Sequence, residues 1–233
     1  MTNSKKIIIT QSNYIPWKGY FDGMALASDF VIYDDMQYTK RDWRNRNLIK
    51  TAQGLKWLSI PIEVKGKYFQ KINETKISDT KWNIDHLNQL KQNYKNARNY
   101  KEVIDWIEDL YINCKFDLLT DVNQYFLENI ITFLGIKINL LRSENFTLLE
   151  DKTERLVKIC KDLNATEYFS GPAAKAYMDE RKFMDNNIIV TYFDYSDYKH
   201  YKQTYEPFEH GVSIIDLIFN EGKNAHNLLK HLS

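Results

Sequence analysis

Two adjacent carboxylates and one histidine are the side chains of this chain best suited to acid–base chemistry. Asp34 and Asp35 directly follow a short apolar run, and His86 stands four residues after Trp82, on the same face of an expected helix. A carboxylate can coordinate Mg²⁺, orient an amine or accept its proton, and a histidine titrates near neutral pH. We therefore take Asp34, Asp35 and His86 as the candidate catalytic groups. The structural alternatives are a strand-end turn for the aspartates and a packed or surface position for the histidine.

A cationic run follows the two carboxylates. It contains Lys40, Arg41, Arg44 and Arg46, and Trp43 interrupts it. Guanidinium and ammonium groups bind phosphate oxygens through charge-assisted hydrogen bonds. Cations beside an aromatic ring also fit the backbone of RNA. The chain has 32 Lys and Arg against 31 Asp and Glu, and so no global field to attract nucleic acid. We expect a small phosphate-bearing ligand rather than a nucleic acid.

The tetrapeptide Trp17-Lys18-Gly19-Tyr20 stands at the expected start of a helix after the first strand. Nucleotidylyltransferase-like enzymes carry His-x-Gly-His at this place, where the helix N-terminus and the motif hold the phosphates of ATP. Here both histidine positions are aromatic. Lys18 would then bind phosphate, while Trp17 and Tyr20 would pack and stack on the ligand. The sequence identifies no cofactor, although ATP with Mg²⁺ would fit this arrangement.

Further candidate binding residues are polar or cationic side chains at strand ends and in the turns that follow. The segment Ser170-Gly171-Pro172, with Lys175 after it, resembles a strand-to-helix turn in which small residues let the backbone approach an anion. The remaining histidines and the cysteines Cys114 and Cys160 lack metal-ligand spacing, so we expect no metal site, and buried thiols in a reducing compartment. The full set of expected binding residues is Gln11, Asn13, Trp17, Lys18, Gly19, Tyr20, Gln37, Lys40, Arg44, Arg46, Asn47, Ser170 and Lys175.

A parallel sheet is needed to bring these side chains together. The unbroken apolar run 6–10 predicts a strand buried on both faces, 17–27 predicts an amphipathic helix, and 30–33 predicts the next buried strand. Strand, helix and strand in about 30 residues form a βαβ unit with a right-handed crossover. Ligands of open α/β sheets bind beyond the carboxyl ends of the strands. This rule places on one rim the residues that follow the two strands, namely Gln11, Ser12, Asn13, Asp34, Asp35 and Gln37.

The rest of the chain combines both element types around a helical middle section, which we expect to be an insertion spanning 79–134. We therefore predict one α/β domain over residues 1–233, with a mostly parallel, Rossmann-like sheet flanked by helices. The apolar spacing and the end signals predict helices over 79–94, 100–113, 117–134, 173–183 and 212–219, a helix opened by the capping box of Asp151 and Glu154, and strands at 56–62, 70–77, 136–141, 167–169 and 188–193.

Composition and the N-terminal residues bear on location. The content of 43% hydrophobic and 27% charged residues is ordinary for soluble globular proteins. No apolar run approaches the roughly 20 residues that a membrane span needs, and MTNSKK leads into a strand without the apolar core of a signal peptide. We expect a cytoplasmic protein without a membrane span.

Four segments resemble the bacterial WbqC-like family, over nearly the whole chain. They read QSNYIPWKGYF, SDFVIYDDMQYTKRDWRNRNLI, SGPAAKAYMDE and SIIDLIFNEG. The resemblance implies a cytoplasmic protein from surface-polysaccharide or O-antigen gene clusters, and transfer of glycine or another small acyl unit to an amino sugar. It brings no agreed set of catalytic residues, so the site residues above rest on their own chemistry.

These two lines combine into one hypothesis. Forming an amide from a free acid and a sugar amine is uphill in water, so the acid must arrive as an adenylate, a thioester or an aminoacyl-tRNA ester. The expected partner is a nucleotide-linked sugar or another phosphate-bearing small molecule. Two alternatives remain at this point. One is a non-catalytic sugar-nucleotide-binding or scaffold protein of the same pathway, and the other is an RNA-binding module centred on residues 40–46.

Overall fold

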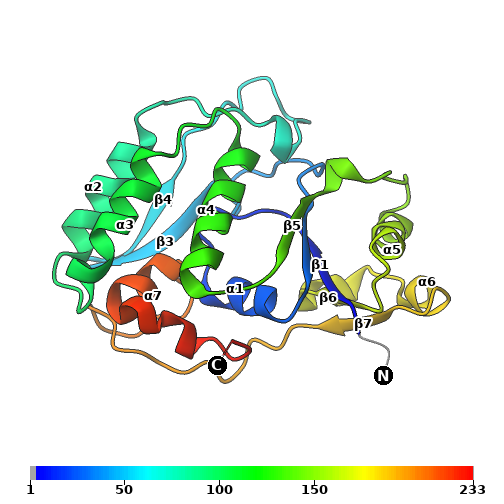
Figure 1. Ribbon diagram of the computed structural model, residues 1–233. Helices are drawn as coiled ribbons and strands as arrows, with labels where there is room; N and C mark the ends of the chain where they lie inside the picture. The colour runs from blue at the N-terminus through cyan, green and yellow to red at the C-terminus, as the bar shows by residue number, and fades with distance from the viewer. Residues whose placement is uncertain (1–3, 233) are drawn as a thin grey trace.

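A run of β-branched residues forms the central strand of the protein, β1 (Lys6–Thr10). The computed structural model describes residues 4–232 and places β1 in a five-stranded parallel sheet of order β5-β2-β1-β6-β7 (Figure 1). The neighbours of β1 are β2 (Asp29–Ile32) and β6 (Glu167–Ser170), and the edges are β5 (Asn139–Arg142) and β7 (Ile189–Tyr192). The predicted α/β fold with a mostly parallel, Rossmann-like sheet is therefore confirmed.

The alternation of side chains along β1 divides the core into two layers. Ile8 faces the layer that contains α1 (Lys18–Ala25), α4 (Leu119–Leu134) and α7 (Ile214–Glu221). Ile7 and Ile9 face the opposite layer, made by α5 (Lys152–Asp162) and α6 (Glu180–Met184). Figure 1 shows these two groups of helices on opposite sides of the sheet. Burial on both faces explains the unbroken apolar run of the strand.

A second, two-stranded sheet lies beside the main one. It is the antiparallel hairpin of β3 (Arg46–Thr51) and β4 (Gly54–Ser59). Ile49 and Leu58 are buried in the same core cluster as α2 (Trp82–Tyr94) and α3 (Tyr100–Ile112). These helices and α4 are the predicted helical middle section. The sequence did not predict β3, because its polar residues Asn47 and Lys50 are buried through specific hydrogen bonds rather than through an apolar pattern.

Two other predictions of element type are wrong. The segment 70–77 is not a strand but contains the short 3₁₀ helix η1 (Ile72–Glu74), flanked by isolated bridges at Lys71, Lys76 and Ile77. The expected helix over 173–183 is divided into η3 (Pro172–Ala176) and α6, with Asp179 capping α6 through the Arg181 amide. The remaining short elements are η2 (Ser143–Asn145) and η4 (Gly222–Leu228).

Residues 193–213, here called the strap, connect β7 to α7 without a helix or strand and run along the lower edge of Figure 1. Buried side chains from the N-terminal part of the chain hold the strap. Lys18 Nζ donates to Lys199 O at 2.8 Å, and Lys50 Nζ donates to Tyr205 O at 2.7 Å and to Pro207 O. Two lysines thus hold the strap by donating hydrogen bonds to its backbone carbonyl groups.

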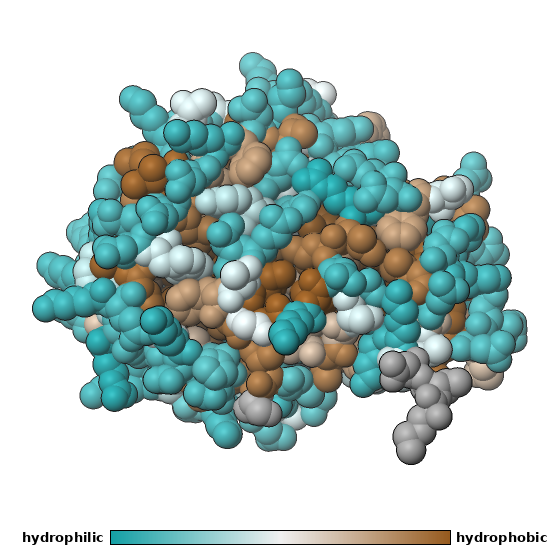
Figure 2. Space-filling view, viewed as in Figure 1, coloured by the Kyte–Doolittle hydropathy of each residue, from teal (hydrophilic) through white to brown (hydrophobic). Residues whose placement is uncertain are grey.

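The surface is mostly hydrophilic, with one hydrophobic area near the centre of the view over α4 and β5 (Figure 2). An open groove of about 650 Å³ follows the outer side of edge strand β5 and is lined in part by Ile131, Leu140 and Leu163. Within residues 4–232, every helix is too short or too polar to cross a membrane. Both cysteines are buried and unpaired, as predicted, and burial raises the pKa of each thiol to about 12.

Candidate functional site

The strand order places a topological switch point between β1 and β6. The chain continues from β1 to β2 and β5 on one side, and β6 and β7 lie on the other. Ligands of such sheets bind in the crevice beyond the carboxyl ends of the strands at this point. Gln11, Ser12 and Asn13 follow β1 there. We call these three residues, with Asp34, Asp35 and Arg44, the rim.

Asp34 is buried, and its side chain links the end of β2 to the end of β1 and to α4. Its side chain accepts hydrogen bonds from Ser12 N (2.8 Å), Ser12 Oγ (2.7 Å) and Thr120 Oγ1 (2.7 Å), and the residue is 2% exposed. Burial raises the pKa of Asp34, although these hydrogen bonds and Arg44 oppose the shift. With three internal donors, Asp34 joins β1, β2 and α4 rather than facing a ligand.

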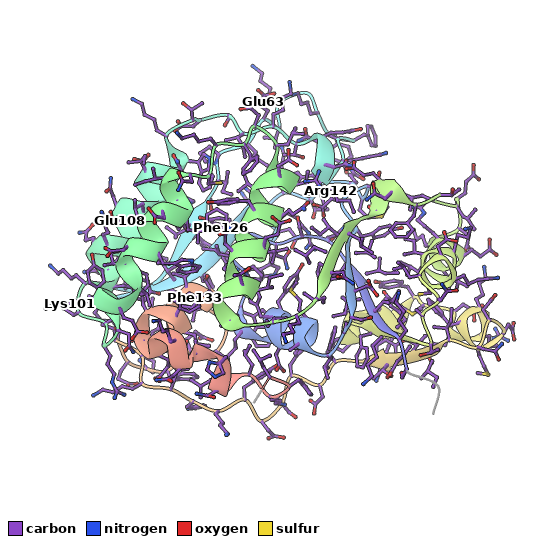
Figure 3. The ribbon with its side chains drawn as sticks, viewed as in Figure 1. Glu63, Lys101, Glu108, Phe126, Phe133 and Arg142 are labelled. Carbon is purple, nitrogen blue, oxygen red and sulfur yellow. The ribbon has the colours of Figure 1, made fainter. Side chains whose placement is uncertain are left out.

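Asp35 is the more accessible carboxylate of the pair. Its side chain is 12% exposed, accepts from Ser143 Oγ at 2.5 Å and lies 3.7 Å from Lys71 Nζ. It lines, with Asn73 and Arg142 among others, a cavity of about 10 Å³, which is room for one water molecule. Figure 3 shows Arg142 at the carboxyl end of β5, beside this part of the rim. Asp35 is therefore the more exposed carboxylate of the rim.

Arg44 comes to the rim from the loop before β3. One terminal nitrogen, Nη1, donates to Asn13 Oδ1 and to Ser12 O (3.3 Å), and Nη2 lies 3.5 Å from Asp42 Oδ2. The buried Nε donates to no atom of residues 4–232. Asn123 of α4 fixes the loop by donating to Arg44 O at 2.9 Å. The structure thus places the predicted residues Asn13, Arg44 and Asp35 beyond the carboxyl ends of the strands.

The predicted motif at the start of α1 fastens the strap instead of facing the rim. A Cβ on Gly19 would lie 2.3 Å from Trp17 Cζ2, so the indole of Trp17 lies directly over Gly19. The Lys18 ammonium lies 5.2 to 5.9 Å from the ring centroids of Tyr198, Tyr201 and Phe208, and burial lowers its pKa to about 8. We therefore revise the expected phosphate-binding role of Lys18 and the stacking role of Trp17.

Tyr20 belongs to the support of the rim. Its hydroxyl donates to Gln11 O at 3.0 Å, which fixes the backbone at the end of β1. Its ring packs in a T-shaped contact with Phe21 and a tilted contact with Phe30, so both neighbours of the half-buried ring are core residues rather than residues of the rim. The Gln11 side chain itself is half-buried at the rim.

His86 lies in the core between α2 and the hairpin, away from the rim. Its Nε2 faces Ser59 O at 3.3 Å, so this nitrogen carries the proton, and its Nδ1 accepts from Tyr14 Oη at 2.9 Å. Tyr111 continues this chain of hydrogen bonds at 2.7 Å from Tyr14. Burial lowers the pKa of His86 to about 4. Its predicted catalytic role is therefore revised to a structural one.

The other expected binding residues are exposed, pack on aromatic rings or support loops, except Ser170, which ends β6, the other strand of the switch point. Gln37 donates to Tyr68 O at 2.8 Å, and Asn47 donates to Tyr14 O and Ile15 O. Lys40 is exposed, and Ser170 is buried at the end of β6. The Lys175 ammonium lies 4.7 Å from the ring centroid of Tyr192, and the Arg46 guanidinium lies 4.0 Å from that of Trp57.

Sequence reasoning missed the partners that distant elements contribute. Thr120 and Asn123 come from α4 and Asn73 from η1, and no local pattern distinguishes them from other polar helix residues. Arg142 and Ser143 are different, because they directly follow the apolar run that became β5. The strand-end rule applied to that run would have found them. Among residues 4–232, no three His, Cys, Asp or Glu side chains are placed to hold a metal ion.

Comparison with known proteins gives one family and one close relative. A model of the WbqC-like protein family matches residues 11–228. The uncharacterized protein Rv1507c of Mycobacterium tuberculosis is 49% identical over 227 residues, which cover 97% of this chain and 98% of that protein. No solved structure matches.

Proposed function

The chain belongs to the WbqC-like protein family, and from this premise we propose that it is a cytoplasmic transferase of surface-polysaccharide (O-antigen) biosynthesis. It binds a nucleotide-linked amino sugar at the rim and places an acyl or aminoacyl unit on the sugar amine. The observation that supports this proposal best is the contact of Arg44 with Asn13 beyond the carboxyl end of β1, one of the two strands of the switch point, with Asp35 following the adjacent strand β2.

Each rim residue has a role that its chemistry allows. Arg44 binds a phosphate oxygen of the sugar nucleotide, and Asn13 orients the guanidinium. Asp35 orients the amine and takes its proton while the amine nitrogen attacks the activated carbonyl. The new C–N bond forms as the bond from the carbonyl carbon to its activating group breaks, and AMP, a thiol or tRNA leaves. Ser143 and Lys71 hold Asp35 during this step.

A second function is favoured by the burial of the other candidate bases. Asp34 and His86 are engaged by internal partners, which leaves Asp35 as the accessible member of the predicted catalytic set. A site with one accessible carboxylate also suits a protein that binds a sugar nucleotide without transforming it. This non-catalytic binding or scaffold protein is the alternative.

Mass spectrometry tests the transferase proposal. The protein is mixed with a nucleotide-linked amino sugar and, in parallel, with glycine plus Mg-ATP, acyl-CoA or glycyl-tRNA, and the sugar is examined for an added acyl mass. We expect a product with one donor, its loss in Asp35→Asn, and its retention in Asp105→Asn, which changes an exposed aspartate of α3. Calorimetry with the same sugar nucleotide separates the alternatives, because binding without product from any donor contradicts the transferase and supports the binding protein.

A further inference from the structure

Two tryptophans lie exposed next to each other outside the rim. Trp43 is 42% exposed and Trp57 is 39% exposed, whereas Trp17, Trp82 and Trp106 are buried or half-buried. The ring centroids of the exposed pair are 5.2 Å apart, with 46° between the ring planes. We call Trp43, Trp57 and Arg46 the tryptophan platform, because the Arg46 guanidinium lies 4.0 Å from the Trp57 centroid. Exposed indoles stacked with arginine are typical of binding surfaces.

The hairpin holds the platform on its outward face. Ile49 and Leu58 point into the core, so the alternating residues Leu48 and Trp57, which are opposite each other, point the other way. On the same face, toward the carboxyl end of β3, Lys50 Nζ donates to Tyr205 O of the strap. The platform lies at the other end, where the loop before β3 contributes Trp43.

The charge around the platform selects the kind of ligand. Lys40 and Arg41 are exposed nearby in the chain. The only carboxylate of the loop 39–46, Asp42, already accepts from Thr39 Oγ1 (2.8 Å) and Trp43 N (2.7 Å). A ligand with a planar ring and a separate, negatively charged group fits this combination. The indoles stack on the face of the ring, and the cations neutralise the charged group. A nucleotide has both properties.

The platform is joined to the rim through the backbone. Tyr14 N donates to Trp43 O at 3.1 Å, and Arg44, the next residue, reaches Asn13. We propose that Trp43 and Trp57 stack on the base of the nucleotide-linked sugar, while Arg46 and its neighbouring cations face the phosphates on the way to Arg44. This inference rests on the proposed function. It transfers the stacking role expected of Trp17 and Tyr20 to two residues that are exposed.

Tryptophan fluorescence tests the inference directly, because the proposed contact involves the two exposed indoles. Uridine diphosphate and adenosine diphosphate are titrated into the wild-type protein, with inorganic pyrophosphate as the probe that lacks a base. We expect at least one nucleotide to quench the emission and to bind more tightly than pyrophosphate. Trp43→Ala and Trp57→Ala should each weaken nucleotide binding by roughly 10-fold, measured by calorimetry. Trp57→Phe should retain most of the affinity, and Phe69→Ala, a control at an 82% exposed aromatic residue elsewhere, should bind as the wild type does.

The possible failures are distinguishable. If a nucleotide binds but both tryptophan variants bind it as tightly as the wild type, the platform inference is wrong and the proposed function stands. If neither nucleotides nor nucleotide-linked amino sugars bind, the proposed function fails together with the inference. If a single-stranded RNA oligonucleotide binds the platform far more tightly than either nucleotide, with an affinity that falls steeply with salt, the platform is a nucleic-acid surface and the inference is overturned.

Discussion

Trp17 and Gly19 depend on each other sterically. The indole of Trp17 lies where a side chain on Gly19 would be, and its edge packs against Tyr195 and Tyr198 of the strap. The glycine is therefore needed for a close contact between ring and helix backbone, and not for an unusual backbone angle.

We expect Gly19→Ala to displace Trp17 and to lower the free energy of unfolding by about 1–3 kcal/mol through overpacking. Urea denaturation followed by circular dichroism measures this change. The matched control is Gly171→Ala, because nothing lies within 4 Å of a Cβ built there. Equal midpoints for the two variants would contradict the proposed contact.

His86 makes stability depend on pH. Burial lowers its pKa from 6.5 to about 4, so the neutral ring stabilises the folded state fully above pH 6.5, and this contribution is lost as the pH falls through 6.5 toward 4. The difference of about 2.5 pKa units corresponds to about 3 kcal/mol near pH 4. We expect the free energy of unfolding to fall less between pH 7 and pH 4.5 in His86→Gln than in the wild type. His200→Gln, at an exposed histidine, should keep the wild-type slope.

The two aspartates show what the sequence predicts about a site and what it leaves open. The strand-end rule located both residues beyond the end of a buried strand. The accessible one could not be identified, because one of the two hydroxyls that engage Asp34 belongs to Thr120, 86 residues away. The same limit explains His86, whose partners Tyr14 and Ser59 come from other elements.

Among the elements, the hairpin makes contacts that are distant in the sequence. Lys50 on β3 is buried and donates to two carbonyl groups of the strap, while Lys56 on β4 is exposed. Because Ile49 pairs with Lys56, the two lysines lie at nearly the same level of the hairpin. They form a natural pair for comparison.

We expect Lys50→Met to loosen the strap while the hairpin stays folded, because the methylene stem remains but the donor is removed. Loss of the donor to these two carbonyl groups should speed amide exchange in peptides covering residues 198–211 by about 10-fold or more. Hydrogen exchange with mass spectrometry measures this rate. Lys56→Met is the control, and a similar effect in both variants would refute the role of Lys50.

At the scale of the whole molecule, one core cluster extends from the sheet into the helical insertion. It contains Ile8 and Phe30 of the sheet as well as Tyr111 and Phe126 of the helices. Figure 3 shows Phe126 on α4, and its ring lies 5.3 Å from that of Tyr14 and 4.9 Å from that of Tyr111. This continuity supports the prediction of a single domain.

We therefore expect Phe126→Ala to destabilise the entire chain by about 3–5 kcal/mol in one transition. Tryptophan fluorescence and far-ultraviolet circular dichroism should give the same midpoint, since Trp82 and Trp106 lie in the helical insertion and Trp17 lies at the start of α1 beside the sheet. Phe116→Ala, at an exposed phenylalanine, should leave the midpoint nearly unchanged. Two separate transitions would mean that the insertion is an independent unit.

The fold was more predictable than the site for a physical reason. Parallel strands such as β1 and β2 are buried on both faces, and their apolar runs can be recognised locally. The hairpin and the strap are stabilised by single buried lysines and by carboxylates such as Asp216, which accepts from Tyr94 and Tyr201. Such contacts leave no periodic pattern in the sequence.

The position of α7 has a consequence for synthesis on the ribosome. Ile214, Ile215 and Phe219 belong to the same core cluster as Tyr14 and Ile49, yet Ile214 is made 165 residues after Ile49. Until they emerge, the hairpin and α3 lack the helix that completes their core, and apolar surface stays exposed. The nascent chain should therefore depend on chaperones until α7 has emerged, and removal of α7 should destabilise the hairpin and α3 as well.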